Sequence, residues 1–385
     1  MATRFFRKRS ILAKIEGTYG VDAAPTGAAN AIQAQNVQIT PMELEYLDRD
    51  LVRAYLGHQE QIVVTSRVRL TYDVEIAGSG IAGVAPAWGP LWRGAGFSET
   101  ALAAAHAGTA QAGGASTITL AAGASAVDNA YRGMRIRLTG GTGTGQSRVG
   151  SAYVGATKVL TVSEPWTTPP DGTTVYSIDA QVAYLPVSDT FEALTKYFNM
   201  DGMRHIMLGA RGTGGIQLNA RSLPMFSFDF QGLMGTISDT ALPTDVFTAW
   251  KKPLPVNNAN TSGFSLHSFA GKLYGLDIAA SNSVVYRNLV GIEDVLVTYR
   301  APAGSVTIER PTIAEKDYFT RVKDVTLGPL SVLHGTTAGN QVHVHLPSTS
   351  LTQPRFENRE SVVALQMALR AIANLGNDDI AIQAL

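Results

Sequence analysis

The stretch that decides the fold is Ile62-Val-Val-Thr-Ser-Arg-Val-Arg-Leu-Thr-Tyr-Asp-Val-Glu-Ile76. Its even positions are apolar except for Ser66, and its odd positions are polar from Thr65 onward. Strict alternation of this kind indicates a β-strand with one face toward a core. The run is about three times the usual strand length of roughly 5–6 residues. The polar side chains that share the odd face are Thr65, Arg67, Arg69, Thr71, Asp73 and Glu75.

Further strands follow from the same pattern. Residues 216–221 and 306–310 alternate, and 226–231 place three phenylalanines on one strand face. Met200-Asp-Gly-Met203 has the sequence of a two-residue hairpin turn, so we expect a hairpin there. The turn would join strands over 191–199 and 203–209.

Helical signals are few. Residues 86–97 predict one short helix, because Pro86 suits a first turn and Trp88, Leu91 and Trp92 form an apolar stripe. Residues 361–373 fit a strand and a helix equally well, so periodicity leaves both open. The sequence therefore predicts a mainly β protein, a β-sandwich or partial barrel with one short flanking helix.

The composition changes between residues 106 and 185. This part is rich in Gly, Ala, Ser and Thr, and short β runs at 116–120, 134–139, 159–162 and 175–178 are separated by close turns. That texture is typical of a small all-β unit. We expect residues 106–185 to form a small β domain that projects outward from a discontinuous larger domain, residues 1–105 and 186–385.

The charge balance narrows the classes of function. The chain has no cysteine, and its 31 basic residues balance 31 acidic residues. The missing thiols exclude a disulfide scaffold and a thiolate zinc site, and zero net charge disfavours a highly basic nucleic-acid binder. Charged residues make up 16% of the chain, against a usual share of about 25%. Because charge helps to keep monomers apart, we expect much of the surface to be buried against other copies.

Neither a secretory leader nor a membrane helix is expected. The apolar run after the basic segment Arg4–Arg9 is too short for a leader. No apolar run approaches the roughly 18 residues of a membrane helix. We expect a soluble protein that is made in a cytoplasm.

One glycine-rich loop resembles a phosphate-binding loop. Gly140-Gly-Thr-Gly-Thr-Gly-Gln-Ser147 has Gln146 where the loop needs lysine, and strand-like sequence follows instead of a helix. A flexible hairpin is the better interpretation.

Two other groups of polar residues are better explained by structural roles than by catalysis or metal binding. Val342-His-Val-His345 places two imidazoles on one strand face without a third metal ligand nearby. We expect an exposed or inter-subunit face, where His343 and His345 titrate near pH 6.5 beside a neighbouring copy. The carboxylates of Glu43, Glu45 and the segment 48–50 are expected in a solvated or subunit-contacting loop. No catalytic, cofactor-binding or metal-binding set stands out, so we expect a protein that is not an enzyme.

Four passages of the chain resemble a known family. They are Ala13-Lys-Ile-Glu-Gly-Thr-Tyr-Gly20, the long strand leading into Gly89-Pro-Leu-Trp-Arg-Gly-Ala-Gly-Phe97, the hairpin Phe198–His205 with Gly209–Gly212, and Leu223-Pro-Met-Phe-Ser-Phe-Asp-Phe-Gln-Gly232. These passages resemble the major tail tube proteins of bacteriophages with long, non-contractile tails. The C-terminal third is similar only loosely. The inserted unit resembles small β domains of many phage virion proteins.

The resemblance implies a structural virion protein. Six copies would form a ring whose strands close an inner β-barrel, and rings would stack into a tube around a tape-measure protein before DNA passes through. The polar residues of the odd face (65–75) would face the lumen. The loop 38–61 would reach a neighbouring subunit or the next ring, with contact residues Met42, Leu44, Tyr46, Leu51 and Tyr55. The 361–373 ambiguity would resolve toward a strand.

Two alternatives stay open at this point. One is a single-ring protein of the same fold, such as a distal tail or baseplate hub protein or a tail terminator. The other is a β-protein that binds the host surface, which needs an aromatic platform. The inserted unit offers Tyr131, Tyr153, Trp166, Tyr176 and Tyr184 for one.

Overall fold

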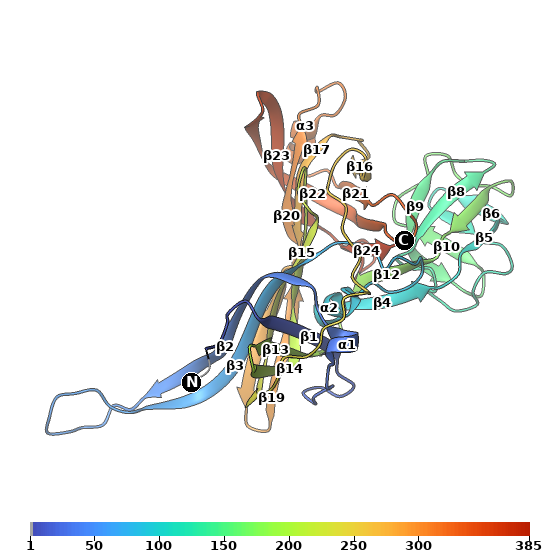
Figure 1. Cartoon of the computed structure of the whole chain (residues 1–385). Coiled ribbons are helices and arrows are strands. Elements are labelled where there is room, and N and C mark those ends of the chain that lie inside the picture. The colour runs from blue at the N-terminus through green and yellow to red at the C-terminus, as the bar shows by residue number, and fades with distance from the viewer. Residues whose placement is uncertain (1–2) are drawn as a thin grey trace.

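The computed structural model describes residues 3–385 and confirms a mainly β fold (Figure 1). The described chain has three short helices, where the sequence predicted one. They are α1 (Gly27–Asn30), α2 (Gly89–Gly94) and α3 (Tyr318–Lys323). The predicted helix at 86–97 is α2, which is shorter because Gly96 takes the left-handed φ of +82° that ends a helix.

Fifteen strands belong to one large sheet, and all its pairings are antiparallel. These strands are β1 (Arg9–Ile15), β2 (Ala34–Asp48), β3 (Gln61–Glu75), β4 (Phe97–Leu102), β12 (Gln181–Pro186), β13 (Leu194–Met200), β14 (Met203–Asn219), β15 (Met225–Asp239), β16 (Thr261–Leu266), β17 (Leu273–Ala279), β20 (Ala303–Glu309), β21 (Gly328–His334), β22 (Val342–Arg359), β23 (Val362–Ala371) and β24 (Ala381–Ala384).

Two smaller groups complete the fold. A seven-stranded sheet contains β5 (His106–Thr109), β6 (Ala112–Gly114), β7 (Thr117–Thr119), β8 (Arg135–Gly140), β9 (Ser147–Val154), β10 (Val159–Val162) and β11 (Val175–Ile178). A separate hairpin consists of β18 (Asn282–Leu289) and β19 (Ile292–Arg300).

Most strand predictions are confirmed. The run 62–76 is β3, the phenylalanine strand is β15, and the ambiguous stretch 361–373 is the strand β23. The predicted two-residue turn joins β13 to β14, with positive φ at Asp201 and Gly202. That backbone matches the right-handed twist of the flanking strands.

The core lies between the apolar face of β3 and β15 and the helix α2. Trp88, Leu91 and Trp92 of α2 are almost completely buried. The Trp92 ring meets those of Phe226 and Phe228 edge-on, at centroid distances of 5.3 and 5.4 Å. Edge-on aromatic pairs stabilise a fold beyond the area that they bury, so the alternation of β15 fixes the position of α2.

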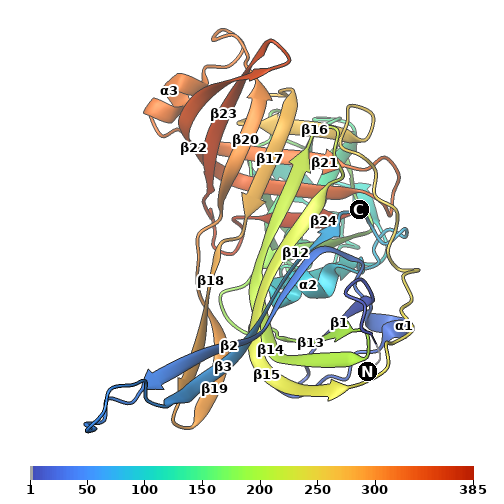
Figure 2. The same ribbon diagram turned by 60° about the vertical axis from the view of Figure 1, so that its left-hand side comes forward.

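Twelve of the fifteen strands form two halves with the same strand order, and β24, β12 and β4 complete the sheet. In the first half, neighbouring strands follow the order β1-β13-β14-β15-β3-β2, and in the second half they follow β16-β21-β22-β23-β20-β17. In the first half β1, β2 and β3 precede the helix α2 and β13, β14 and β15 follow it, as β16, β17 and β20 precede α3 and β21, β22 and β23 follow it in the second half. The halves join where β14 pairs with β17, and this makes the long ribbon of strands in Figure 2.

The seven-stranded sheet lies to one side of the large sheet, drawn in green in Figure 1. It has its own hydrophobic cluster, built around Ile118, Ile136, Leu160 and Tyr176. The chain enters it from β4 and returns through β12, which belong to the large sheet and pair with each other.

Candidate assembly surfaces

The longest projection of the molecule is a β-hairpin made of β2 and β3. The two strands stay paired from Ala34 opposite Val74 out to Asp48 opposite Gln61, and the hairpin leaves the body of the protein (Figure 1). The segment 38–61, predicted as a loop, is therefore a strand up to Asp48 and a loop only at its tip. We call residues 41–66 the arm.

The arm carries an unusual amount of exposed apolar surface. Of the predicted contact residues, Met42, Tyr46, Leu51 and Tyr55 are exposed and Leu44 is half-buried. Further exposed apolar side chains are Leu47, Val52, Leu56, Ile62, Val63 and Val64. Val52 and Leu56 are as open as in an extended chain, at 104% and 103%. Apolar surface gathered in this way marks an interaction site.

The carboxylates at the root of the arm neutralise an arginine. The Arg67 guanidinium donates to Glu43 Oε2 at 2.7 Å and to Glu45 Oε1 at 3.1 Å. Both glutamates lie on β2, where their side chains share a sheet face with Arg67, and this corrects the expected loop position. These carboxylates form a structural ion-pair group.

The polar face of β3 continues onto neighbouring strands. Arg69 forms two hydrogen bonds with Asp229 of β15, at 2.9 and 2.5 Å. Thr71 and Asp73 line one shallow hollow together with Asp229 and with Thr213 of β14. The face thus combines both signs of charge over several strands.

One predicted lumen residue differs from the others. Thr65 is 9% exposed, and its hydroxyl has no hydrogen-bond partner among the described residues. The adjacent Ser66 carbonyl accepts a hydrogen bond from Tyr286 of β18 at 3.4 Å. Residues 67–75 of the odd face remain half-buried or exposed.

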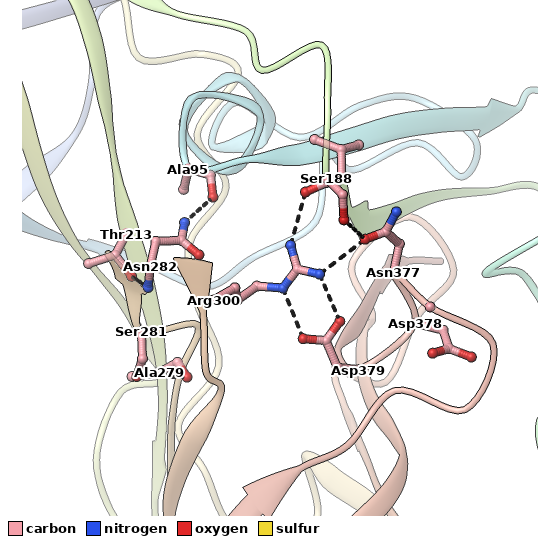
Figure 3. Close-up of polar contacts among 12 residues, drawn as sticks. Ala95, Ser188, Thr213, Ala279, Ser281, Asn282, Arg300, Asn377, Asp378 and Asp379 are labelled. Atoms are coloured by element: carbon pink, nitrogen blue, oxygen red, sulfur yellow. Dashed lines mark hydrogen bonds and ion pairs between the residues drawn. The ribbon is translucent and has the colours of Figure 1, made fainter. Parts of the chain in front are cut away.

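A mostly buried arginine ties the β18–β19 hairpin to the chain segments that follow β12 and precede β24 (Figure 3). Arg300 at the end of β19 donates to both oxygens of Asp379, at 2.9 and 3.2 Å. It also donates to the Val187 carbonyl, which follows β12, and to the Asn377 amide oxygen. The two ionised side chains are 14% and 6% exposed, so their charges depend on each other for stabilisation. Sequence reasoning missed this pair because its members are far apart in the chain.

A nearby connection joins the β18–β19 hairpin to the first half of the large sheet. The Asn282 amide at the start of β18 donates to the carbonyls of Ala95 and Gly212, at 2.6 and 2.9 Å. Its backbone N–H donates to the Thr213 hydroxyl. We call the contact of β17, β18 and β19 with the first half the internal seam.

The paired histidines are buried, and the expectation of an exposed face was wrong. His345 accepts from or donates to Ser163 of the seven-stranded sheet at 3.0 Å, and His343 contacts Gln383 and Ser331. Burial lowers the pKa of His345 to about 3, and it lowers the pKa of His343 well below the usual value. Titration near pH 6.5 is therefore excluded for this chain by itself, because the small sheet covers both rings.

The glycine-rich loop is a hairpin between β8 and β9, held by the residue that replaces lysine. The Gln146 side chain donates to the carbonyls of Gly143 and Thr168 and accepts from the N–H groups of Thr167 and Thr168. Lysine has no acceptor atom, so glutamine suits a structural turn here.

Three further observations concern other kinds of site. The aromatic side chains of the inserted unit are buried, which leaves no exposed platform there: Tyr131, Tyr153, Trp166, Tyr176 and Tyr184. Between residues 3 and 385, no three His, Cys, Asp or Glu side chains are grouped as metal ligands. Within the same range, none of the helices has the length and apolar character to cross a membrane.

Comparison with known proteins shows the family of the chain. No curated protein matches the chain. The sequence profile of one family, described as "Phage tail tube protein", matches residues 7–383, which includes the C-terminal third and the inserted sheet. The chain therefore belongs to the phage tail tube protein family.

Proposed function

We propose that copies of this structural protein assemble into rings that each contain six tail tube units, where a unit is one copy of the tail tube fold. The rings stack into the tube of a phage tail. The tube encloses a tape-measure protein and later conducts DNA to the host. A tail terminator and distal tail proteins are the proposed partners at its ends. Assembly takes place in the host cytoplasm, before the tube becomes part of the virion.

The arm is the observation that supports this proposal most. An exposed arm with ten or so apolar side chains is costly in water, because each one gains about 1.5–3 kcal/mol when it is fully buried. A stacked ring covers the arm against a neighbouring copy or the next ring. The contact residues predicted from the sequence, such as Leu51 and Tyr55, are among the exposed ones.

The polar face of β3 supports its role as the lumen wall. Arg67 and Arg69 are each paired with carboxylates, so they offer few unopposed charges to phosphate groups. Tight nucleic-acid binding depends on cations that replace the counterions of the phosphates. A lumen lined in this way lets DNA pass without specific binding.

A triple variant of the arm tests the proposal. We expect the purified chain to form tubes that are visible by negative-stain electron microscopy. Leu51→Ser, Val52→Ser and Leu56→Ser together should abolish tubes and leave the circular dichroism spectrum unchanged. The matched control, Val127→Ser, removes an exposed apolar side chain from the inserted unit and should leave tubes intact. Tubes formed by the triple variant would contradict the role of the arm, and single rings from the wild type would favour a hub or terminator.

We also propose that the inserted unit projects outward and takes no part in the tube wall. Leu102 and Gln181 lie directly opposite each other on β4 and β12, so an Asn-Gly turn is able to replace residues 103–180. The deletion uncovers His343 and His345, and its folding is checked by circular dichroism. A folded deletion variant should still form tubes; its failure to do so would overturn this placement.

A further inference from the structure

The two halves of the large sheet correspond residue by residue. In the first half, β2 takes four residues from Ala34 to Gln38 while β3 takes three from Val74 to Thr71. In the second half, β17 takes four residues from Leu273 to Asp277 while β20 takes three from Ile308 to Ser305. The extra residue that both strands carry in this span makes Gln38 the counterpart of Asp277.

The buried side chains correspond as well. β15 pairs with β3 as β23 pairs with β20, and the registers align the three phenylalanines of β15 with three aliphatic residues of β23. All six side chains are at most 3% exposed: Phe226, Phe228 and Phe230, with Leu365, Met367 and Leu369. The second half is thus a repeat of the first, with the same core positions filled by other residues.

The internal seam shows how one repeat pairs with the next. β14 of the first half pairs with β17 of the second half, from Gly215 opposite Ala279 to Asn219 opposite Gly275. The counterparts of these strands are β22 and β2. Within residues 3–385, β2 pairs with β3 alone, and the C-terminal part of β22 pairs with β23 alone. Each chain therefore has two open edges of the kinds that meet inside it.

We propose that β22 of one copy pairs with β2 of the next copy in the register of the internal seam. The correspondence places Phe356 opposite Ile39 and Glu357 opposite Gln38. Phe356 is 60% exposed, whereas its counterpart Ile216 is buried to 1% beside Ile278. Pairing between copies removes both open edges, which otherwise favour uncontrolled association.

The arm has a counterpart in the same scheme. It corresponds to the β18–β19 hairpin, because Glu43 lies five residues after Gln38 on the chain, as Asn282 lies five residues after Asp277. That hairpin lies against β14 and β15, where Arg211 of β14 donates to the Val295 carbonyl of β19 at 2.8 Å. The arm of one copy accordingly lies against β22 and β23 of its neighbour.

Together with the proposed ring of six units, this pairing gives the number of chains in the ring. Each chain contains two units, so three chains supply the six units in place of six chains. Eight strands of each chain form the continuous ribbon from β2 to β22. Three chains then give a barrel of about 24 strands and roughly 50 Å in width, and six chains give one of roughly 100 Å.

Cysteine cross-linking tests the register, because the chain has no cysteine of its own. The test variant carries Gln38→Cys and Glu357→Cys. The in-chain reference carries Gln217→Cys and Asp277→Cys, which are their counterparts across the internal seam. A mismatched control carries Gln38→Cys and Gln366→Cys, where β23 places the second thiol one strand further away, about 10 Å from the first.

The assembled proteins are oxidised and run on a non-reducing gel. We expect the test variant to give one-, two- and three-chain bands, ending near three times 40.8 kDa. The reference should give a faster monomer, and the mismatched control a monomer alone. A ladder that runs to six chains would overturn the three-chain ring. Tubes without cross-links in the test variant would overturn the edge pairing but leave the tube function intact, whereas absence of any assembly would contradict the function itself.

Discussion

The buried pair of Arg300 and Asp379 gives the sharpest test of how the β18–β19 hairpin is held to the rest of the protein. Arg300→Ala removes four hydrogen bonds, to Asp379, Asn377 and the Val187 carbonyl. It leaves the Asp379 carboxylate 6% exposed without a cation. Breaking a buried pair on one side costs about 3–5 kcal/mol, so we expect the free energy of unfolding to fall by about that amount.

The chain contains a matched control for this substitution. Arg221 pairs with Glu360 at the surface, and their side chains are 79% and 67% exposed. Solvent screens the charges of an exposed pair, which therefore contributes little to stability, so Arg221→Ala should have a small effect. Arg300→Met combined with Asp379→Leu should recover most of the loss, because no charge is then stranded.

Urea unfolding of the unassembled chain measures these effects. Tryptophan fluorescence is a suitable signal, since Trp88 and Trp92 lie in the core of the first half. The reasoning is refuted if Arg300→Ala shifts the unfolding midpoint no more than Arg221→Ala does. It is also refuted if the double variant is less stable than Arg300→Ala.

Three further predictions concern single residues. The folded-state pKa of His345 is about 3 against 6.5 when unfolded. Stability therefore falls as pH drops below 6.5, by about 2 kcal/mol at pH 5. His345→Gln should reduce this loss in acid unfolding, and His58→Gln at the exposed arm tip should not. Burial lowers the pKa of Lys196, on β13, well below 10.5, so the wild type gains stability as pH rises toward 10.5. Lys196→Met removes this pH dependence, so urea unfolding should show the stability difference shifting toward the wild type between pH 7 and pH 10. Gln146→Lys should lower the melting temperature and create no nucleotide binding in calorimetry, because the loop opens no helix; nucleotide binding by this variant would contradict the assignment of the loop as a structural turn.

The local pattern of the sequence predicted the strands well. Alternation at 62–76 and 226–231 sufficed for β3 and β15, because one face of each strand is buried along most of its length. The stretch 361–373 stayed ambiguous, since its apolar residues fit two periods. Its strand form depends on pairing with β20 and β22 on both sides, which is tertiary information.

Contacts between distant segments could not be predicted from the sequence. His345 and Ser163 are 182 positions apart, so the sequence around the histidines does not indicate that the small sheet covers them. Ile62 and Val64 continue the apolar alternation of the core although they lie on the exposed arm. Alternation predicts that a strand has an apolar face, but it does not indicate whether the core or another copy of the chain covers that face. The repeat was equally hidden, because Phe226 and Leu365 occupy matching positions with different side chains.

Electron cryomicroscopy of the purified, assembled chain tests the central claim most directly. The account predicts tubes of stacked rings whose continuous β-barrel carries the polar face of β3 toward the lumen and the arm against a neighbouring copy. Monomers or isolated single rings under all assembly conditions, or a barrel with residues 67–75 facing outward, would contradict it.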